Sequence, residues 1–441
     1  MKRWKVAVLL TTVGLAIGGG AMVRGAVAVH ATPAPPTQRS SVLQAFYTPP
    51  VLVRAGERVQ VPVDVVCATA AGTPCPTTVT MGARAGAGRW EEATAPGAKE
   101  MRFDLTAPAS RSVAAGGSGR VSFFLRATDA SGRTEALGSP RSPLAFYVAR
   151  DLPVVRVPAV PFGLVRHPET VLSLRWGSGS GRAGLEPGLE SATVGPSSFD
   201  VDAAGRIYLA DSLQDRVAVF RSGQLVRQIP LAVSARADIA AGADGRAFVA
   251  DGAHGSVVVR GFDRAGRATG TASIGNALSW HIRANGNGAF VNVLPLDAWV
   301  PAGGGPPGVG MPTASGARLI RLGTERSVRL GSVRGDRVTD AVEIVSTVRF
   351  GEVALAEPDR AGGYVVVVHV WRAVPTPADQ YQVIHVAGTR LLETFGVASS
   401  TFAETPPLSR FRLGKDGRLY QMTSSPSGVK IVRFELGRSG R

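Results

Sequence analysis

The chain has 441 residues, which is enough for two or three domains, each with its own core. Its formal net charge of +16 is carried almost entirely by arginine and favours anionic partners, although a compositional bias toward Arg, Ala and Gly is an alternative explanation. The arginines are scattered, without a dense basic run or an interleaved aromatic stripe, which argues against nucleic-acid binding.

The N-terminus has the three parts of a secretory signal peptide. A positively charged start precedes the short apolar stretch Val6–Ile17, and Ala26–Ala28 supplies small residues for cleavage. We therefore predict a signal peptide over residues 1–28 and a linker over 29–42, with an uncleaved anchor as the alternative. No later segment is apolar for long enough to span a membrane as a helix. The mature protein is expected to be secreted, outside the cell or in the cell envelope, without a membrane span.

The chain has two cysteines, Cys67 and Cys75. An even pair in an exported protein predicts one disulfide bond. Two cysteines at this spacing, with no histidine nearby, make a poor metal site.

The sequence pattern of residues 43–150 predicts an all-β domain. Polar and apolar residues alternate in Val59–Val66, and turns rich in Gly and Pro separate the segments that follow. The further predicted strands are Lys99–Leu105, Arg120–Ala127, a short strand after Asp129–Gly132, and Leu144–Val148. In length and pattern this stretch resembles bacterial immunoglobulin-like β-sandwich domains, although it lacks a Trp between distant cysteines. The proline-rich residues 151–168 are predicted to be a connector.

From residue 169 to 441 the sequence repeats a pattern of short strand, glycine turn, apolar strand with an aromatic residue, polar turn and apolar strand. The copies lie at Ser198–Phe220, Ala237–Val259, Trp280–Val293, Ala354–Val370, and Ser409–Met422 with Gly428–Leu436. Tyr208, Phe248 and Phe290 are spaced by 40 and 42 residues, close to the length of one four-stranded propeller blade. The next spacing is longer and contains Pro301–Gly316, which we interpret as a loop insertion. Ala317–Leu322 and Ser327–Val333 are then expected to be the two outer strands of the interrupted blade.

Several of these strands are apolar throughout, as in Ile207–Ala210 and Val365–Val368. A strand with one wet face would alternate, so both faces of these strands must be buried. The sheets of a propeller pack against each other in this way. Helices on both faces would do the same, but no helix-period stretch lies between the strands.

Residues 198–220 resemble an NHL-type propeller repeat, with Asp211 at a strand end and Arg216 leading into the strand that ends at Phe220. We therefore expect an immunoglobulin-like β-sandwich followed by a propeller of five blades, or of six if residues 300–350 form a blade of their own. The last repeat supplies three strands, so Thr170–Trp176 is the candidate for the strand that closes the ring.

Asp211 and Asp251 recur at the same strand end in consecutive repeats. A carboxylate there accepts N–H bonds from the following turn, and Arg216 pairs with Asp211 or its turn. A catalytic site needs a unique constellation, so the recurrence predicts a structural role for these three residues.

No catalytic residue or cofactor is predicted. His254 and His281 come from adjacent repeats and are the candidates for a metal site facing the central channel, as in NHL-like amidating lyases. Gluconolactonase-like propellers bind a metal through a Glu in the first blade, and this chain has none in that place. Asp200 and Asp202 are the other candidates for side chains that line the channel.

Two hypotheses follow. The first is a secreted, non-enzymatic recognition or scaffold protein that binds a protein or an anionic glycan of the cell envelope through its propeller loops. The alternative is a propeller-type lyase or hydrolase with a channel site, which could depend on a metal. Acidic and histidine side chains grouped in the channel would favour the enzyme, and an arginine-rich funnel would favour binding.

Overall fold

A computed structural model describes residues 40–47, 51–57, 59–95, 102–106, 119–188, 193–252, 256–275, 281–293, 298–305, 307–373, 375–399, 402–403 and 409–437. These residues form an all-β structure of eight sheets, and their one helical element is the 3₁₀ turn Ser212–Gln214. The predicted signal peptide, residues 1–28, lies outside them. Within the described ranges no helix is long and apolar enough to cross a membrane.

The N-terminal part consists of two sheets that pack around one apolar core. One sheet has the order β1 (Ser40–Tyr47), β3 (Gln60–Thr69), β6 (Arg102–Thr106). The other has the order β2 (Leu52–Arg54), β9 (Leu144–Ala149), β7 (Gly119–Asp129), β4 (Thr77–Ala85), β5 (Glu91–Ala95), with β8 (Thr134–Leu137) also pairing with β7. Alternate residues of β3, including Val61 and Val63, face side chains such as Met81 and Phe123 from the other sheet.

The disulfide predicted between Cys67 and Cys75 is present. It links the end of β3 to the turn that precedes β4, and both cysteines belong to the core between the two sheets. Closing this short loop stabilises the fold by roughly 2–3 kcal/mol if the effect is mainly on the entropy of the unfolded chain.

Two sequence-based boundaries were wrong. The linker predicted over 29–42 overlaps β1, which begins at Ser40. The connector predicted over 151–168 contains a strand, β10 (Val154–Val157), which pairs in parallel with β28 (Arg337–Ser346). Val155 and Val157 are buried while Val154 and Arg156 are exposed, so this segment alternates like a strand despite the prolines on either side.

The rest of the chain has a propeller-type arrangement of six sheets in the described residues. The first two are β13 (Ser198–Val201), β14 (Ile207–Asp211), β15 (Arg216–Arg221), β16 (Gln224–Pro230), and β17 (Asp238–Ala241), β18 (Ala247–Asp251), β19 (Val257–Phe262), β20 (Ala268–Ile274). The next two are β21 (Ile282–Asn285), β22 (Gly288–Val293), β23 (Ala298–Pro301), β24 (Gly308–Val309), and β25 (Met311–Pro312), β26 (Arg318–Gly323), β27 (Ser327–Arg334), β28 with β10. The last two are β29 (Phe350–Pro358), β30 (Tyr364–Arg372), β31 (Ala378–Ala387), β32 (Arg390–Val397), and β33 (Phe411–Leu413), β34 (Leu419–Ser425), β35 (Gly428–Phe434), β11 (Glu169–Trp176), β12 (Arg182–Ala183).

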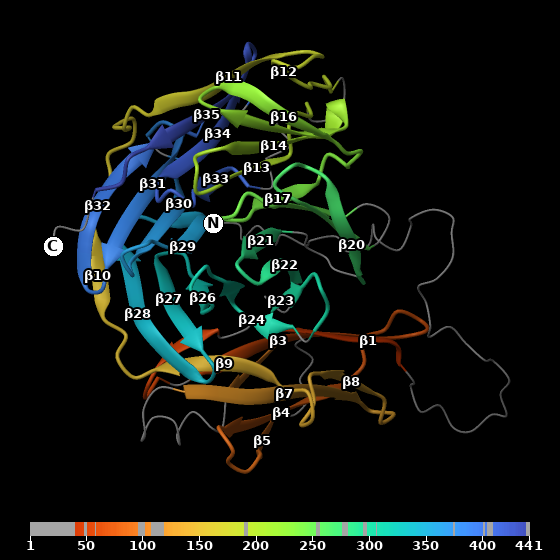
Figure 1. Ribbon diagram of the computed structural model, residues 1–441. Helices are drawn as coiled ribbons and strands as arrows, with labels where there is room; N and C mark the ends of the chain where they lie inside the picture. Colours follow the sequence, from red (N-terminus) through yellow and green to blue (C-terminus); the bar gives the residue numbers. More distant parts are fainter. Residues whose placement is uncertain are drawn as a thin grey trace, which may run out of the picture.

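The sheets follow one another around a common centre (Figure 1). Inner strands of neighbouring sheets are in contact, and β33 of the last sheet contacts β13 of the first. The strand expected to complete the last sheet is found there, because β11 pairs antiparallel with β35, with Leu172 opposite Ile431 and Leu174 opposite Val429. The last sheet therefore combines β33, β34 and β35 from the C-terminal end of the chain with β11 and β12, which precede the first sheet in sequence.

The region from 300 to 350 differs from the preferred five-blade interpretation and follows the six-blade alternative. Ala317–Leu322 and Ser327–Val333 fall in β26 and β27, the second and third strands of a separate sheet, and are not outer strands of the preceding one. Pro301–Gly316 is not simply an inserted loop, since it contains β24 and β25. These two-residue strands end one sheet and begin the next.

Double-sided burial accounts for the uninterrupted apolar strands. Every residue of β14 is buried, as are Val365–Val368 in β30. Alternate residues of β14 belong to two different clusters: Leu209 packs toward β11 and β35, and Tyr208 packs toward the sheet that begins with β17. The sheet that contains β14 is thus packed between its two neighbours, as the sequence predicted.

The two parts of the molecule share an apolar interface. Leu52 and Tyr147 of the N-terminal sheets pack with Ile320 and Val333 of the sheet that contains β26 and β27. At its edge the Arg329 guanidinium lies 2.7 Å from Glu57 and 3.1 Å from Glu343. Figure 1 shows the N-terminal strands lying directly against this side of the propeller.

Asp211, Arg216 and Asp251 make structural contacts, and Arg216 pairs with Asp211 as the sequence predicted. Asp211 accepts a bond from the Gly184 amide at 3.1 Å and lies 3.2 Å from the Arg216 guanidinium, which itself donates to the Arg182 carbonyl. Asp251 accepts bonds from the amide and hydroxyl of Ser234. Both carboxylates therefore hold a segment that precedes the inner strand of their own sheet, and Asp211 also accepts a bond from the side chain of Gln214, in the turn that follows it.

Candidate functional site

A cavity of about 250 Å³ opens at the propeller centre, on the side where the inner strands begin. Single residues from several sheets line it. His281 immediately precedes β21, and Arg283 belongs to that strand. Trp299 comes from β23 and Arg321 from β26. On the other side lie Glu352 of β29, and Ser409 and Arg410 immediately before β33. We call this cavity the axis pocket.

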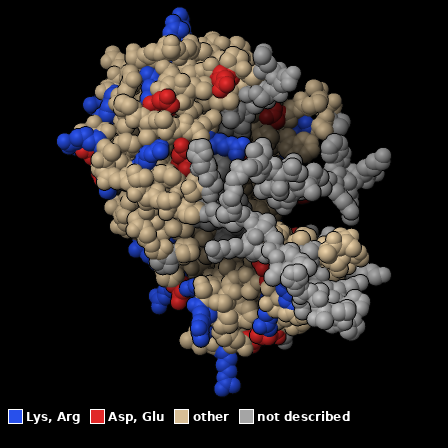
Figure 2. Space-filling view, turned by 90° about the vertical axis from the view of Figure 1, so that its right-hand side faces the viewer, with Lys and Arg blue, Asp and Glu red and all other residues tan. Residues whose placement is uncertain are grey.

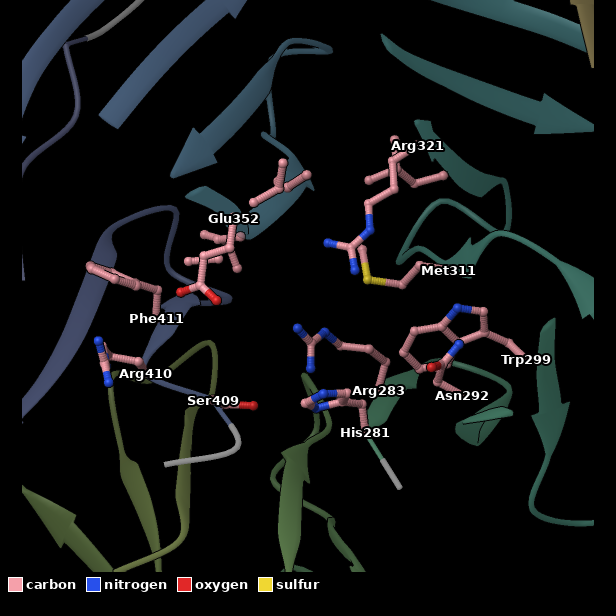
Figure 3. A pocket seen from close by; sticks show the side chains of 15 residues that line it. His281, Arg283, Asn292, Trp299, Met311, Arg321, Glu352, Ser409, Arg410 and Phe411 are labelled. Atoms are coloured by element: carbon pink, nitrogen blue, oxygen red, sulfur yellow. The ribbon is translucent and has the colours of Figure 1, made fainter. Parts of the chain in front are cut away.

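Figure 3 shows how the charged side chains of the axis pocket are arranged. Arg283, Arg321 and the Glu352 carboxylate point toward a shared space, while Arg410 lies along the opposite wall beside Phe411. Arg410 donates to the Tyr381 hydroxyl and lies over the Tyr381 ring. The pocket is thus lined by three arginines, of which Arg410 is bonded to Tyr381, and by one carboxylate together with the partly exposed His281.

The base of the axis pocket is formed by an ion pair. The Arg283 guanidinium lies 3.0 Å from the buried Glu357 carboxylate and also donates to the Ile282 carbonyl. Arg283 lines a second cavity as well, where the inner strands end, together with Glu357 and Lys415. Arg283 is therefore shared by the two cavities, and its partner Glu357 lines the second of them.

A second buried pair joins four sheets around the centre. Asp238 and Arg412 are almost fully buried, and the Arg412 guanidinium lies 2.7 Å from the Asp238 carboxylate. Arg412 also donates to the carbonyls of Phe199 and Ile239 at 2.8 and 2.9 Å. Asp238 in turn accepts a bond from the Ile282 amide. Burial acts to raise the pKa of Asp238, but His281, Arg283 and the bond from Ser198 outweigh it, so the pKa is lowered and the carboxylate stays charged.

The predicted channel residues are only partly brought together. His281 lines the axis pocket, with its Nδ1 atom 3.6 Å from Asp238, whereas His254 lies outside the described residues. Asp200 is buried and accepts bonds from the amides of Val201 and Ala241, and burial raises its pKa. Asp202 is buried against Arg206 and Tyr208, away from the axis pocket. In the described part of the chain no three His, Cys, Asp or Glu side chains are grouped so that they could hold a metal.

The arginines of the axis pocket were not predicted from the sequence. One signal was present: Arg283 interrupts an inner strand, between Ile282 and Ala284, where both faces of the sheet are packed. A charge in such a strand must have a partner or face a cavity. Arg321 and Arg410 carry no comparable signal, because both are exposed or partly exposed residues in a chain rich in arginine.

His385 lies away from the axis pocket and provides a prediction about pH. Its Nε2 atom is 2.7 Å from Asp359 and its Nδ1 atom is 3.7 Å from Glu393. Burial alone would lower the pKa of His385, but these carboxylates raise it to about 9. A pKa above the unfolded value of about 6.5 stabilises the fold at low pH.

We expect the free energy of unfolding to fall as the pH rises from about 6.5 through 9, as the proton that His385 retains in the folded state is lost. Denaturation by urea at a series of pH values measures this change. In His385→Gln the fall over this interval should be smaller, while His369→Gln, which removes a more exposed histidine on the neighbouring strand, should retain it. An identical slope in His385→Gln and the unchanged protein would contradict the assignment.

No protein-family model and no curated protein matches the chain. Among solved structures, a catalytically inactive variant of virginiamycin B lyase from Staphylococcus aureus, with quinupristin, is 9% identical, with a TM-score of 0.33, over 58% of this chain and 99% of that one. A hypothetical protein from Leishmania major is 10% identical, with a TM-score of 0.27, over 63% and 92%. A quinonprotein alcohol dehydrogenase-like protein from Bacteroides thetaiotaomicron is 8% identical, with a TM-score of 0.18, over 79% and 94%.

Proposed function

We propose that the protein is a secreted or envelope-held, non-enzymatic recognition protein that binds an anionic glycan in the axis pocket. The observation that carries this proposal is the lining of the pocket by Arg283, Arg321 and Arg410, with the Glu352 carboxylate in the lining and the Glu357 carboxylate paired to Arg283. An arginine-rich channel mouth was the arrangement expected for binding, as opposed to a group of acidic and histidine side chains. The internal disulfide and the absence of a membrane-spanning helix in the described ranges are compatible with an extracellular location.

The other lining residues favour a sugar as the carrier of the negative charge. Guanidinium groups bind carboxylates through paired hydrogen bonds. Asn292, His281 and Glu352 add groups that exchange hydrogen bonds with hydroxyls, and Trp299 adds an aromatic surface. The volume of about 250 Å³ is suited to one or two sugar units.

The same proposal includes the finer architecture. The propeller-type sheets are taken to be NHL-like repeats, on the strength of residues 198–220, and the N-terminal sheets to be an immunoglobulin-like domain over residues 43–150. Both are modules that commonly serve recognition, which supports a binding role, although fold alone does not fix function.

The test is calorimetric titration with trigalacturonate, an acidic oligosaccharide. Replacing both Arg321 and Arg410 by alanine is expected to weaken binding by at least about tenfold, because two charge-assisted contacts are lost. Arg349→Ala is the control, since this arginine is exposed, belongs to the same part of the propeller and lies outside the pocket. Equal affinity in the double variant, or equal affinity for the neutral methyl ester of the sugar, would refute the proposal.

A further inference from the structure

A second concave surface lies between the two parts of the molecule, apart from the axis pocket. This interdomain cleft has a volume of about 860 Å³. One wall comes from the N-terminal sheets and includes Tyr47 and Tyr147, and the other comes from the segments around β24, β26 and β27. Ala298 and Trp299 are neighbours in β23, yet Ala298 lines the cleft and Trp299 lines the axis pocket. The two hollows therefore lie on different sides of this strand.

The interdomain cleft is lined by positive charge alone. Arg120, Arg318 and Arg334 line it, and none of its lining residues is Asp or Glu. Asp336 lies 3.8 Å from Arg120 but is largely exposed, where an ion pair contributes little. On the face shown in Figure 2, by contrast, basic and acidic side chains are interspersed over the visible described surface. The charged residues that line the cleft are thus all positive, whereas the surface in that view carries both signs of charge.

Of the three arginines, Arg318 gives the strongest indication of an anionic ligand. Its side chain is partly buried, and it donates to the carbonyls of Gly308 and Gly310 at 2.8 and 3.3 Å, with no carboxylate paired to it among the described residues. Burial without a counter-charge lowers the pKa of Arg318. Arg334 is exposed and donates to the Ser315 carbonyl. A guanidinium group held partly out of water in this way gains most from an anionic ligand.

The uncharged residues that line the cleft favour a peptide over a sugar as its ligand. The cleft has no Asn, Gln, Asp, Glu or His, the side chains that exchange paired hydrogen bonds with sugar hydroxyls, whereas the axis pocket has three of these types. Instead it presents aliphatic and proline side chains, including Val51, Leu144 and Val309, beside its two tyrosines. Such a surface accommodates apolar side chains between points of negative charge.

From this combination we propose that the interdomain cleft binds an extended acidic peptide segment of a partner protein, in which carboxylates meet Arg120, Arg318 and Arg334 and intervening apolar side chains meet the tyrosines and aliphatic residues. This site is separate from the one in the proposed function and does not depend on it.

The test is fluorescence anisotropy with a labelled ten-residue peptide that alternates Glu with Leu. Charge reversal of the two more exposed arginines, Arg120→Glu with Arg334→Glu, is expected to weaken binding by at least about tenfold. Arg326→Glu with Arg349→Glu makes the same change of charge outside the cleft and should leave the affinity unchanged. Ser142→Trp narrows the exposed rim of the cleft without altering charge, and should also weaken binding.

Four outcomes would overturn the inference: equal binding of a peptide with Lys in place of Glu, full affinity in both cleft variants, displacement of the peptide by trigalacturonate at an equal charge concentration, or loss of peptide binding in the axis-pocket variant. The axis-pocket variant lacking Arg321 and Arg410 should bind the peptide normally. Loss of peptide binding in that variant would place the peptide in the axis pocket, whereas loss of sugar binding alone would leave the cleft assignment intact.

Discussion

Replacing Arg412 by alanine is expected to lower the free energy of unfolding by about 3–5 kcal/mol, because the substitution leaves the Asp238 carboxylate buried without its partner. The pair is almost entirely shielded from water, with side-chain exposures of 1% for Arg412 and 0% for Asp238. Bonds from the Ser198 and Ser409 hydroxyls and the Ile282 amide would remain, with His281 at 3.6 Å, but none of these is a buried guanidinium in direct contact with the carboxylate.

The position of Arg412 makes the loss larger than that of an ordinary ion pair. Its guanidinium extends from β33 of the last sheet to the Phe199 carbonyl of the first and the Ile239 carbonyl of the second. Both carbonyls are buried and would lose a donor in the variant. The contact between the last and first sheets therefore depends on this side chain as well as on the pairing of β11 with β35.

Arg246→Ala is the matched control for this prediction. Arg246 also forms an ion pair with an aspartate, Asp244 at 2.6 Å, but both side chains are substantially exposed. Such a pair is worth less than about 1 kcal/mol. Urea denaturation of the two variants beside the unchanged protein measures the difference. If Arg412→Ala were as stable as Arg246→Ala, the Arg412–Asp238 pair would not make the predicted contribution to the free energy of unfolding.

The propeller-type fold could be predicted because its main signal is local. The apolar run Ile207–Ala210 requires burial on both faces, and the spacing of Tyr208, Phe248 and Phe290 gives the period of the sheets. The closing strand could be predicted by counting, since the last repeat lacks one strand. These features depend on composition and period within about 40 residues, which a single sequence contains.

The number of sheets in the propeller, and the strand β10 inside the predicted connector, could not be predicted from local sequence signals. In β26 the place of the aromatic residue is taken by Leu319 and Ile320, and β24 and β25 have two residues each within a Gly- and Pro-rich stretch. No periodic marker remains in this sheet. The pairing of β10 with β28 joins segments that are far apart in the chain, and a four-residue strand gives no local indication of its partner.

The axis pocket was beyond sequence reasoning for a different reason. It takes isolated residues from several sheets, such as Arg321, Glu352 and Arg410, and the neighbours of each in the chain point elsewhere. In a chain with 49 Lys and Arg residues, one more arginine carries no information until the fold places it beside others. The conserved geometry of a propeller predicts that a central site exists, but the chemistry of that site depends on which single residue each strand contributes.

Replacing Leu52 by aspartate is expected to separate the unfolding of the two parts of the molecule. Leu52 is fully buried where β2 packs on the propeller, with Tyr147 and Leu152 on its own side and Ile320 and Val333 opposite. An unpaired carboxylate at this position costs several kcal/mol if it remains buried, and opening the interface avoids that cost. The N-terminal core and the propeller clusters are largely separate from this interface, so each part retains most of its own packing.

Calorimetry should therefore show one cooperative transition for the unchanged protein and two for Leu52→Asp, the first of them at a lower temperature. Val66→Asp is the control, because it introduces the same charge at an exposed position of the same sheets, where the side chain is 39% exposed. It should preserve the single transition. Two transitions in the unchanged protein would mean that the ion pairs of Arg329 and the cluster around Leu52 do not couple the two parts, and the interdomain cleft would then lack the fixed walls that its proposed ligand requires.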